Sequence, residues 1–103
     1  MKKAKVLVDG IHAGEIQEIE RGKVYRFVYL ESYKGASVSL EMPLLQLVYE
    51  YDKFPPFFEG LLPEGMMLEG LLRHTKIDRS DLMGQIIAVG GDLVGNVTVE
   101  AVE

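Results

Sequence analysis

Cysteine and tryptophan are both absent from this chain of 103 residues. Without thiols the protein has no disulfide framework, no thiolate zinc site and no cysteine nucleophile. Positive charge is also scarce, because 16 acidic side chains stand against 11 basic ones and the formal net charge is -5. Phosphate backbones are repelled by such a field, so we expect no direct contact with nucleic acid.

Long hydrophobic runs are missing as well. The apolar stretches fall far short of the roughly 18 residues that a membrane-spanning helix needs. The N-terminus, MKKAKVLVDG, lacks the apolar segment and the cleavage site of a signal peptide. We therefore expect a cytoplasmic protein without a membrane partner. Because a hydrophobic content of 48% suffices for one core at this length, residues 1–103 are expected to form a single domain.

The first half of the chain is typical of β-structure. Residues 3–9 and 24–30 are rich in β-branched or aromatic residues, and we expect a strand in each. Residues 14–20 carry two isoleucines among charges, which fits a strand with a bulge. Glycine follows a polar residue at Asp9-Gly10 and at Arg21-Gly22, and both pairs indicate reversals of the chain.

Two further strands are expected from alternation. In residues 37–44, Val38, Leu40 and Met42 alternate with polar side chains, which is the pattern of a half-buried strand. Residues 95–102 alternate in a similar way and predict a last strand that closes the sheet.

The second half of the chain predicts three helices. Proline opens the segments 56–61 and 63–74, and proline is well suited to a first helical turn. Asp78 is the expected N-cap of a third helix, with Asp81 in an imperfect capping-box position and Gly90-Gly91 as the stop. Strands, then helices, then a strand is the order of an α+β domain. We expect a mostly antiparallel sheet of about five strands, with about three helices packed on one side.

Residues that could carry catalysis or bind a metal are sparse. His12 follows a turn and His74 lies near a helix end, so we interpret both as solvated or dipole-capping, with a ligand or base as the alternative. Three glutamates, Glu15, Glu18 and Glu20, are interpreted as the solvated edge of a sheet. We expect no enzyme activity, no metal and no cofactor.

GGDLVG, residues 90–95, is a glycine-rich motif. Consecutive glycines can direct backbone N–H groups at an anion. A phosphate-binding P-loop would need lysine followed by serine or threonine at a helix start, whereas these glycines follow a helix and precede a strand. Helix termination and a tight turn are the interpretation we favour.

Several motifs together resemble a known family. FFEGLLPEG at residues 57–65 is followed by LLR at residues 71–73, by Ile77-Asp78 and by GGDLVGNVTV at residues 90–99. This combination resembles the N-terminal subdomain of the HipA family of serine/threonine kinase toxins. VDGIHAGEI, FVYLESY and SLEMPL in the first half agree, so the resemblance covers nearly the whole chain.

The resemblance implies a role in a toxin–antitoxin system. In the HipA family the kinase machinery lies C-terminal to this subdomain, and none of it is present here. The free-standing form resembles the HipS antitoxin of three-gene HipBST systems, which neutralises a separate kinase toxin, HipT. The implied partners are a HipT-like or HipA-like serine/threonine kinase and a HipB-like helix-turn-helix protein, in a ternary complex. The alternatives are the N-terminal regulatory subdomain of a full-length HipA-like kinase, or an unrelated scaffold or small-molecule binder.

Antitoxin action implies a surface that docks on the kinase and hinders its active-site cleft. We expect this surface in the junction between Pro56 and Pro63 and in the helix that follows it. Methionines are the apolar groups that this region presents most easily to a partner. Phe58, Leu61 and Leu62 could share an inward stripe and are expected in the core. The candidate partner-binding residues are Phe57, Leu62, Pro63, Glu64, Gly65, Met66 and Met67.

Overall fold

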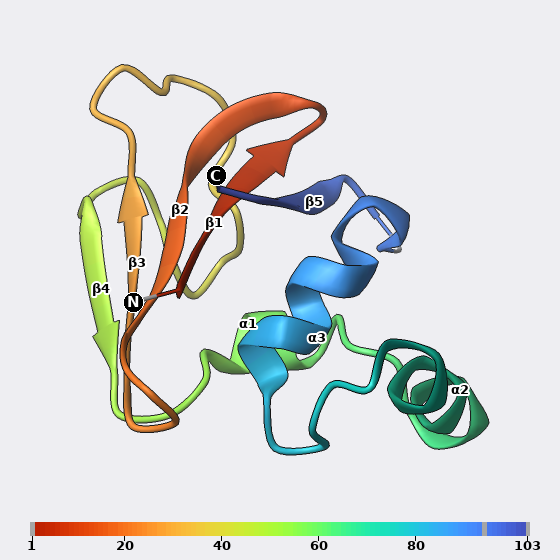
Figure 1. The fold of residues 1–103 in the computed structure, drawn as a ribbon. Helices are drawn as coiled ribbons and strands as arrows, with labels where there is room; N and C mark the ends of the chain where they lie inside the picture. The colour runs from red at the N-terminus through yellow and green to blue at the C-terminus, as the bar shows by residue number, and fades with distance from the viewer. Residues whose placement is uncertain (1, 94, 103) are drawn as a thin grey trace.

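Five antiparallel strands form one sheet in the computed structural model, which describes residues 2–93 and 95–102 (Figure 1). Val94, within the GGDLVG motif, lies outside the described residues. The strand order is β4-β3-β2-β1-β5, so that the first and last strands of the chain are neighbours. The strands are β1 (Lys2–Val8), β2 (Ile11–Glu20), β3 (Val24–Tyr29), β4 (Val48–Tyr51) and β5 (Val97–Ala101).

The reversals between the first three strands lie where the sequence predicts them. Asp9 and Gly10 join β1 to β2 with positive φ angles of 52° and 81°. Glycine adopts such angles without strain, and aspartate is among the residues that tolerate them. The predicted bulge in the second strand is confirmed, because the register between β2 and β3 shifts between Glu18 and Glu20. These turns place three long strands side by side.

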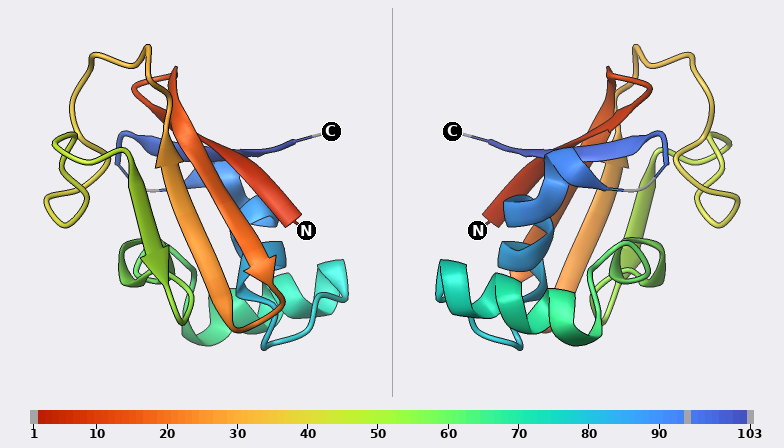
Figure 2. Two further views of the ribbon diagram at one scale, coloured as in Figure 1. Left: turned by 90° about the vertical axis from the view of Figure 1, so that its left-hand side faces the viewer. Right: turned by 90° about the vertical axis from the view of Figure 1, so that its right-hand side faces the viewer.

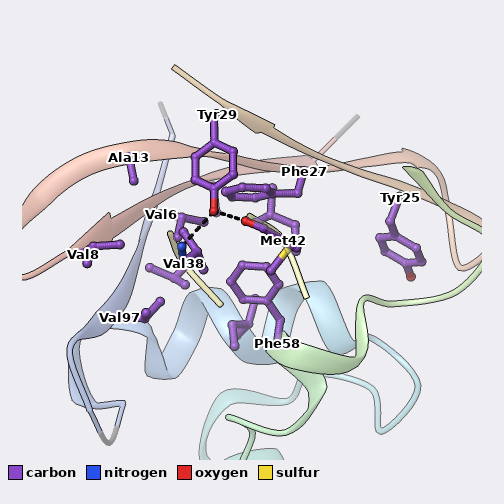
Figure 3. Packing of buried hydrophobic residues seen from close by; sticks show 14 of the residues in the cluster. Val6, Val8, Ala13, Tyr25, Phe27, Tyr29, Val38, Met42, Phe58 and Val97 are labelled. Carbon is purple, nitrogen blue, oxygen red and sulfur yellow. Dashed lines mark hydrogen bonds between the residues drawn. The ribbon is translucent and has the colours of Figure 1, made fainter. Parts of the chain in front are cut away.

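The strand predicted over residues 37–44 is wrong. The segment is irregular, and the fourth strand is Val48–Tyr51. Val38 and Met42 are buried as expected, but Leu40 is 99% exposed, so the alternation does not continue. The hydroxyl group of Tyr29 accepts a hydrogen bond from the Val38 amide and donates one to the Met42 carbonyl (Figure 3). A side chain thus satisfies backbone groups that a neighbouring strand would otherwise bind.

Three helices lie on one face of the sheet, as the two side views in Figure 2 show. Within the described residues they are α1 (Pro56–Glu59), α2 (Gly65–Thr75) and α3 (Leu82–Val89), and a short 3-10 helix (Gly90–Asp92) follows the last of them. This is the predicted α+β architecture, and the third helix ends at the predicted glycines.

The predicted N-cap of the third helix is wrong by three residues. Asp81, rather than Asp78, caps α3, because its side chain accepts a hydrogen bond of 2.9 Å from the Gly84 amide. The carbonyl of Asp78 instead accepts from the Asp81 amide and from the side chain of Gln85. Asp78 therefore belongs to the turn that precedes the helix.

The core lies between the sheet and the helices α1 and α3. Tyr25, Phe27 and Tyr29 of β3 are buried on the inner face, because alternate residues of a strand share one face. Phe58 of α1 is fully buried, and its ring centre lies 5.9 Å from that of Phe27 (Figure 3). Ile86 of α3 is also fully buried. These contacts fix α1 and α3, the helices that precede and follow α2 in the chain.

Candidate partner-binding surface

Helix α2 shows the candidate surface most clearly. None of its eleven residues, all of which the structure describes, is buried. Met66 is 91% exposed and Met67 is 76% exposed. In Figure 1 the helix stands to one side of the sheet and the other helices. A helix of this length is marginal in isolation, and exposed apolar side chains gathered on one element are typical of an interaction surface.

The start of α2 depends on one glycine. Glu64 precedes the helix in an extended conformation, and Gly65 has a φ angle of 58°, in the left-handed region that favours glycine. This change of direction turns the helix away from the link that leads out of α1. Met66 and Met67 are consequently placed in the first turn, directly after Gly65, rather than against the core.

The seven candidate residues divide by exposure. Glu64, Gly65, Met66 and Met67 are exposed, whereas Phe57 and Pro63 are half-buried and Leu62 is only 9% exposed. The expected core roles are confirmed for Phe58 and Leu62, and Leu61 is half-buried against the same cluster. Leu62 therefore offers little of its own surface to a partner.

An apolar cleft of about 480 Å³ opens beside α2. Its near wall is the link between α1 and α2, residues 60–63, together with Met67. Its far wall is formed by Val89, Asp92 and Leu93, at the C-terminal end of α3 and just beyond it. The cleft lies within the usual size range of binding pockets. It joins the link before α2 to a segment nearly thirty residues further along the chain.

The far wall of this cleft is not among the residues that the sequence predicts for the surface. The glycine-rich motif predicts the end of a helix, and α3 does end there. The motif does not predict that Asp92 and Leu93 line a cleft. No local pattern marks Val89, Asp92 or Leu93 as binding residues. The cleft exists only because α3 ends opposite the link that precedes α2, and that is a tertiary arrangement.

The expectation that Glu15, Glu18 and Glu20 form the solvated edge of the sheet is wrong. β2 is the central strand, and Glu18 is only 6% exposed because its side chain points to the inner face beside Tyr25. One carboxylate oxygen of Glu18 accepts hydrogen bonds from the Tyr25 hydroxyl (3.0 Å) and the Gly22 amide (3.2 Å). Burial, the hydrogen bond to Glu18 and the charge of Glu18 raise the pKa of Tyr25 to about 12. Glu18 is a buried structural acceptor.

The two histidines occupy unremarkable positions. The Nε2 atom of His12 lies 3.0 Å from the Gly14 carbonyl oxygen, and His74 is exposed in the last turn of α2. Within residues 2–93 and 95–102 no three His, Asp or Glu side chains are grouped so that they could hold a metal ion. In the same part of the chain, no helix has both the length and the apolar character needed to cross a membrane.

Comparison with known proteins places the chain in a family. The HipA N-terminal domain family matches residues 4–100. An uncharacterized protein of Haemophilus influenzae is 30% identical over 100 residues, which cover 97% of this chain and 92% of that protein. A solved structure described as the N-terminal domain of HipA toxin is 29% identical and has a TM-score of 0.78, covering 100% of this chain and 94% of that one. The protein therefore belongs to the HipA N-terminal domain family.

Proposed function

We propose that this protein is an antitoxin that binds a separate HipA-like or HipT-like serine/threonine kinase toxin and neutralises it. Membership of the HipA N-terminal domain family supports a kinase of this kind as the partner. The observation that carries the proposal is the unburied helix α2, whose first turn presents Met66 and Met67 beside an apolar cleft. The role is that of a binding protein without catalysis of its own.

Neutralisation follows from docking. A kinase must close its two lobes around the nucleotide to assemble its catalytic groups, and a domain wedged against the cleft hinders this closure. The residues that would contact the kinase run from Pro63 to Met67. Phe57 and Leu62, which are more buried, would hold this segment in place. Because the chain has no tryptophan, a bulky wedge comes from phenylalanine, tyrosine or methionine, and at this surface the exposed candidates are Met66 and Met67.

A second role uses the same surface. As the N-terminal regulatory subdomain of a longer HipA-like kinase, the domain would pack α2 against its own kinase region, and the same methionines would be covered. The two roles are distinguished by the adjacent gene: a downstream reading frame that begins at the start of a kinase domain supports a separate toxin. A HipB-like helix-turn-helix protein would complete a ternary complex in the antitoxin case.

Co-purification with a HipA-like or HipT-like kinase from the same organism tests the proposal. The tagged domain is expected to retain the kinase on an affinity column, and its co-expression is expected to restore growth of cells that express the kinase alone. A domain that is folded by circular dichroism, but neither retains the kinase nor restores growth, is not an antitoxin for that kinase.

A further inference from the structure

The apolar cleft beside α2 carries the charge of Asp92, which forms no ion pair within the described residues. Asp92 is the one charged residue among the described residues that line it, and it is exposed at the rim. The ion pairs found within the described residues join Lys2 to Asp81, Arg26 to Glu50 and Arg79 to Glu69, and none includes Asp92. The cleft is thus an apolar hollow with a single free carboxylate at its edge.

Further acidic residues lie next to the link between α1 and α2, residues 60–63. A smaller hollow of about 160 Å³ shares Leu62 and Pro63 with the cleft and is lined by Glu59 and Glu64. Both glutamates are exposed and belong to none of these ion pairs. Arg79 also lines this hollow, but Glu69 engages it at 2.8 Å. Leu62 and Pro63 therefore lie between two hollows whose linings include Asp92, Glu59 and Glu64, and within the described residues none of these carboxylates forms an ion pair.

We propose that the cleft receives an apolar side chain of the kinase, and that an arginine or lysine next to that side chain pairs with Asp92. This inference rests on the proposed function and adds the chemistry of the contact. The apolar lining selects a hydrophobic anchor, and the acidic rim selects a positive neighbour, because complementary potentials favour docking and the wrong sign is repelled. The net charge of -5 also attracts a basic partner surface at long range.

A second copy of this chain fits the cleft poorly. Pairing two copies through the same patch would bring Asp92, Glu59 and Glu64 of each toward the same residues of the other. Like charges that meet across an interface repel each other and weaken association. The rim therefore favours a basic partner over self-association.

Charge variants at Asp92 test the contact by calorimetric titration with the same kinase, in a form whose phosphotransfer is disabled. We expect Asp92→Asn to weaken binding about three-fold and Asp92→Lys about ten-fold, with a flatter dependence on salt than the unchanged protein. Glu31→Lys makes the same change of charge at an exposed residue of the loop after β3 and is the matched control. It is expected to change the affinity less than two-fold.

Amide chemical shifts provide a readout that does not depend on substitution. Binding of the kinase is expected to shift the resonances of Leu61, Val89 and Asp92, because the anchor side chain enters between them. If the kinase binds, but Asp92→Lys binds equally well and the shifts are confined to Met66 and Met67, the inference is overturned while the proposed function stands. Failure of the unchanged protein to bind the kinase overturns both. Self-association of the free domain through these same residues, seen in sedimentation, also overturns the inference.

Discussion

At the scale of single residues, Glu18 shows how a charge is held inside this fold. The alternation of β2 directs Gly14, Ile16 and Glu18 toward the helices, so the carboxylate is buried on the inner face of the sheet. A buried carboxylate is costly unless donors satisfy it. The Tyr25 hydroxyl and the Gly22 amide are those donors, and they tie the turn between β2 and β3 to the inner face of the sheet.

Glu18→Gln is expected to lower the pKa of Tyr25. The substitution removes the negative charge that disfavours tyrosinate, whereas burial, which is the largest cause of the shift, remains. The pKa should therefore fall below about 12 but stay above the ordinary value of 10.0. NMR titration of the assigned Tyr25 ring resonances in the folded variant measures it. A Tyr25 pKa that stays at about 12 would show that Glu18 has no part in the shift.

Gly90 is a second residue whose role is fixed by close contact. A Cβ atom at this position would lie 1.9 Å from the carbonyl oxygen of Val99, because the end of α3 touches β5 here. Gly90→Ala is expected to lower the free energy of unfolding by about 2 kcal/mol, as overpacking does. Gly91→Ala is the matched control, since nothing lies within 4 Å of its Cβ, and it should stay within about 0.5 kcal/mol of the unchanged protein. Urea unfolding distinguishes them.

At the scale of elements, α2 differs from α1 and α3. Phe58 anchors α1, and Met83 and Ile86 anchor α3, but no residue of α2 is fully buried. Its apolar residues recur at helical spacing, as in the other helices, so periodicity alone predicts burial for all three. The helix is held chiefly through its neighbours in the chain, and a partner that covers its apolar side chains would stabilise it.

Replacing Met66 and Met67 together by aspartate is expected to leave the domain folded and to weaken kinase binding at least about ten-fold. Both side chains are largely exposed, and aspartate in the first turn of a helix interacts favourably with the helix dipole. Circular dichroism checks the fold and calorimetric titration measures the affinity. If the double variant unfolds, the two methionines are core residues and the tip is not the docking surface.

A control for this variant lies in the loop before β4. Leu40 and Leu45 are 99% and 96% exposed, and their joint replacement by aspartate makes the same change of charge and polarity away from α2. We expect this variant to bind the kinase with unchanged affinity. An equal loss in both double variants would show that charge in general, rather than the surface of α2, governs binding.

At the scale of the whole molecule, long-range contacts close the fold. β1 pairs with β5, which brings together strands from opposite ends of the chain. The Nζ atom of Lys2 lies 2.9 Å from a carboxylate oxygen of Asp81, which caps α3, and 79 residues separate the two in sequence. The first strand and the last helix are therefore joined by both packing and charge.

This ion pair makes stability depend on pH in the acid range. Burial acts to raise the pKa of Asp81, but hydrogen bonds from Lys2 and the Gly84 amide, together with nearby positive charge, hold it below its ordinary value of 3.8. A lowered pKa means that the stabilisation is present above pH 3.8 and is lost as the pH falls through the pKa of the folded state. The contribution is therefore complete at neutral pH.

Asp81→Asn is expected to reduce the free energy of unfolding at pH 7 by less than about 1 kcal/mol, because asparagine caps a helix nearly as well and Lys2 is partly exposed. Urea unfolding across the acid range should show the two proteins converging below pH 3.8, where Asp81 itself becomes protonated. A difference that stays constant down to the lowest pH would contradict this origin.

Local sequence determined most of the secondary structure. Turn residues with positive φ, such as Gly10, and the aromatic alternation of β3 predict three strands and their hairpins. The predictions that were wrong are those in which tertiary contacts compete with a local pattern. Residues 37–44 alternate because Val38 and Met42 are buried, but the Tyr29 hydroxyl, rather than a neighbouring strand, binds their backbone groups.

The sequence by itself determined the class of fold, the family motifs, the acidic balance of charge and the expectation that Met66 and Met67 are presented to a partner. These depend on spacing and composition, which are properties of the chain. Only the tertiary structure decided that Glu18 is buried, that no residue of α2 is fully buried, and that Asp92 lies at the edge of an apolar cleft. Burial and clefts arise where distant segments meet, and no local pattern records which segments will do so.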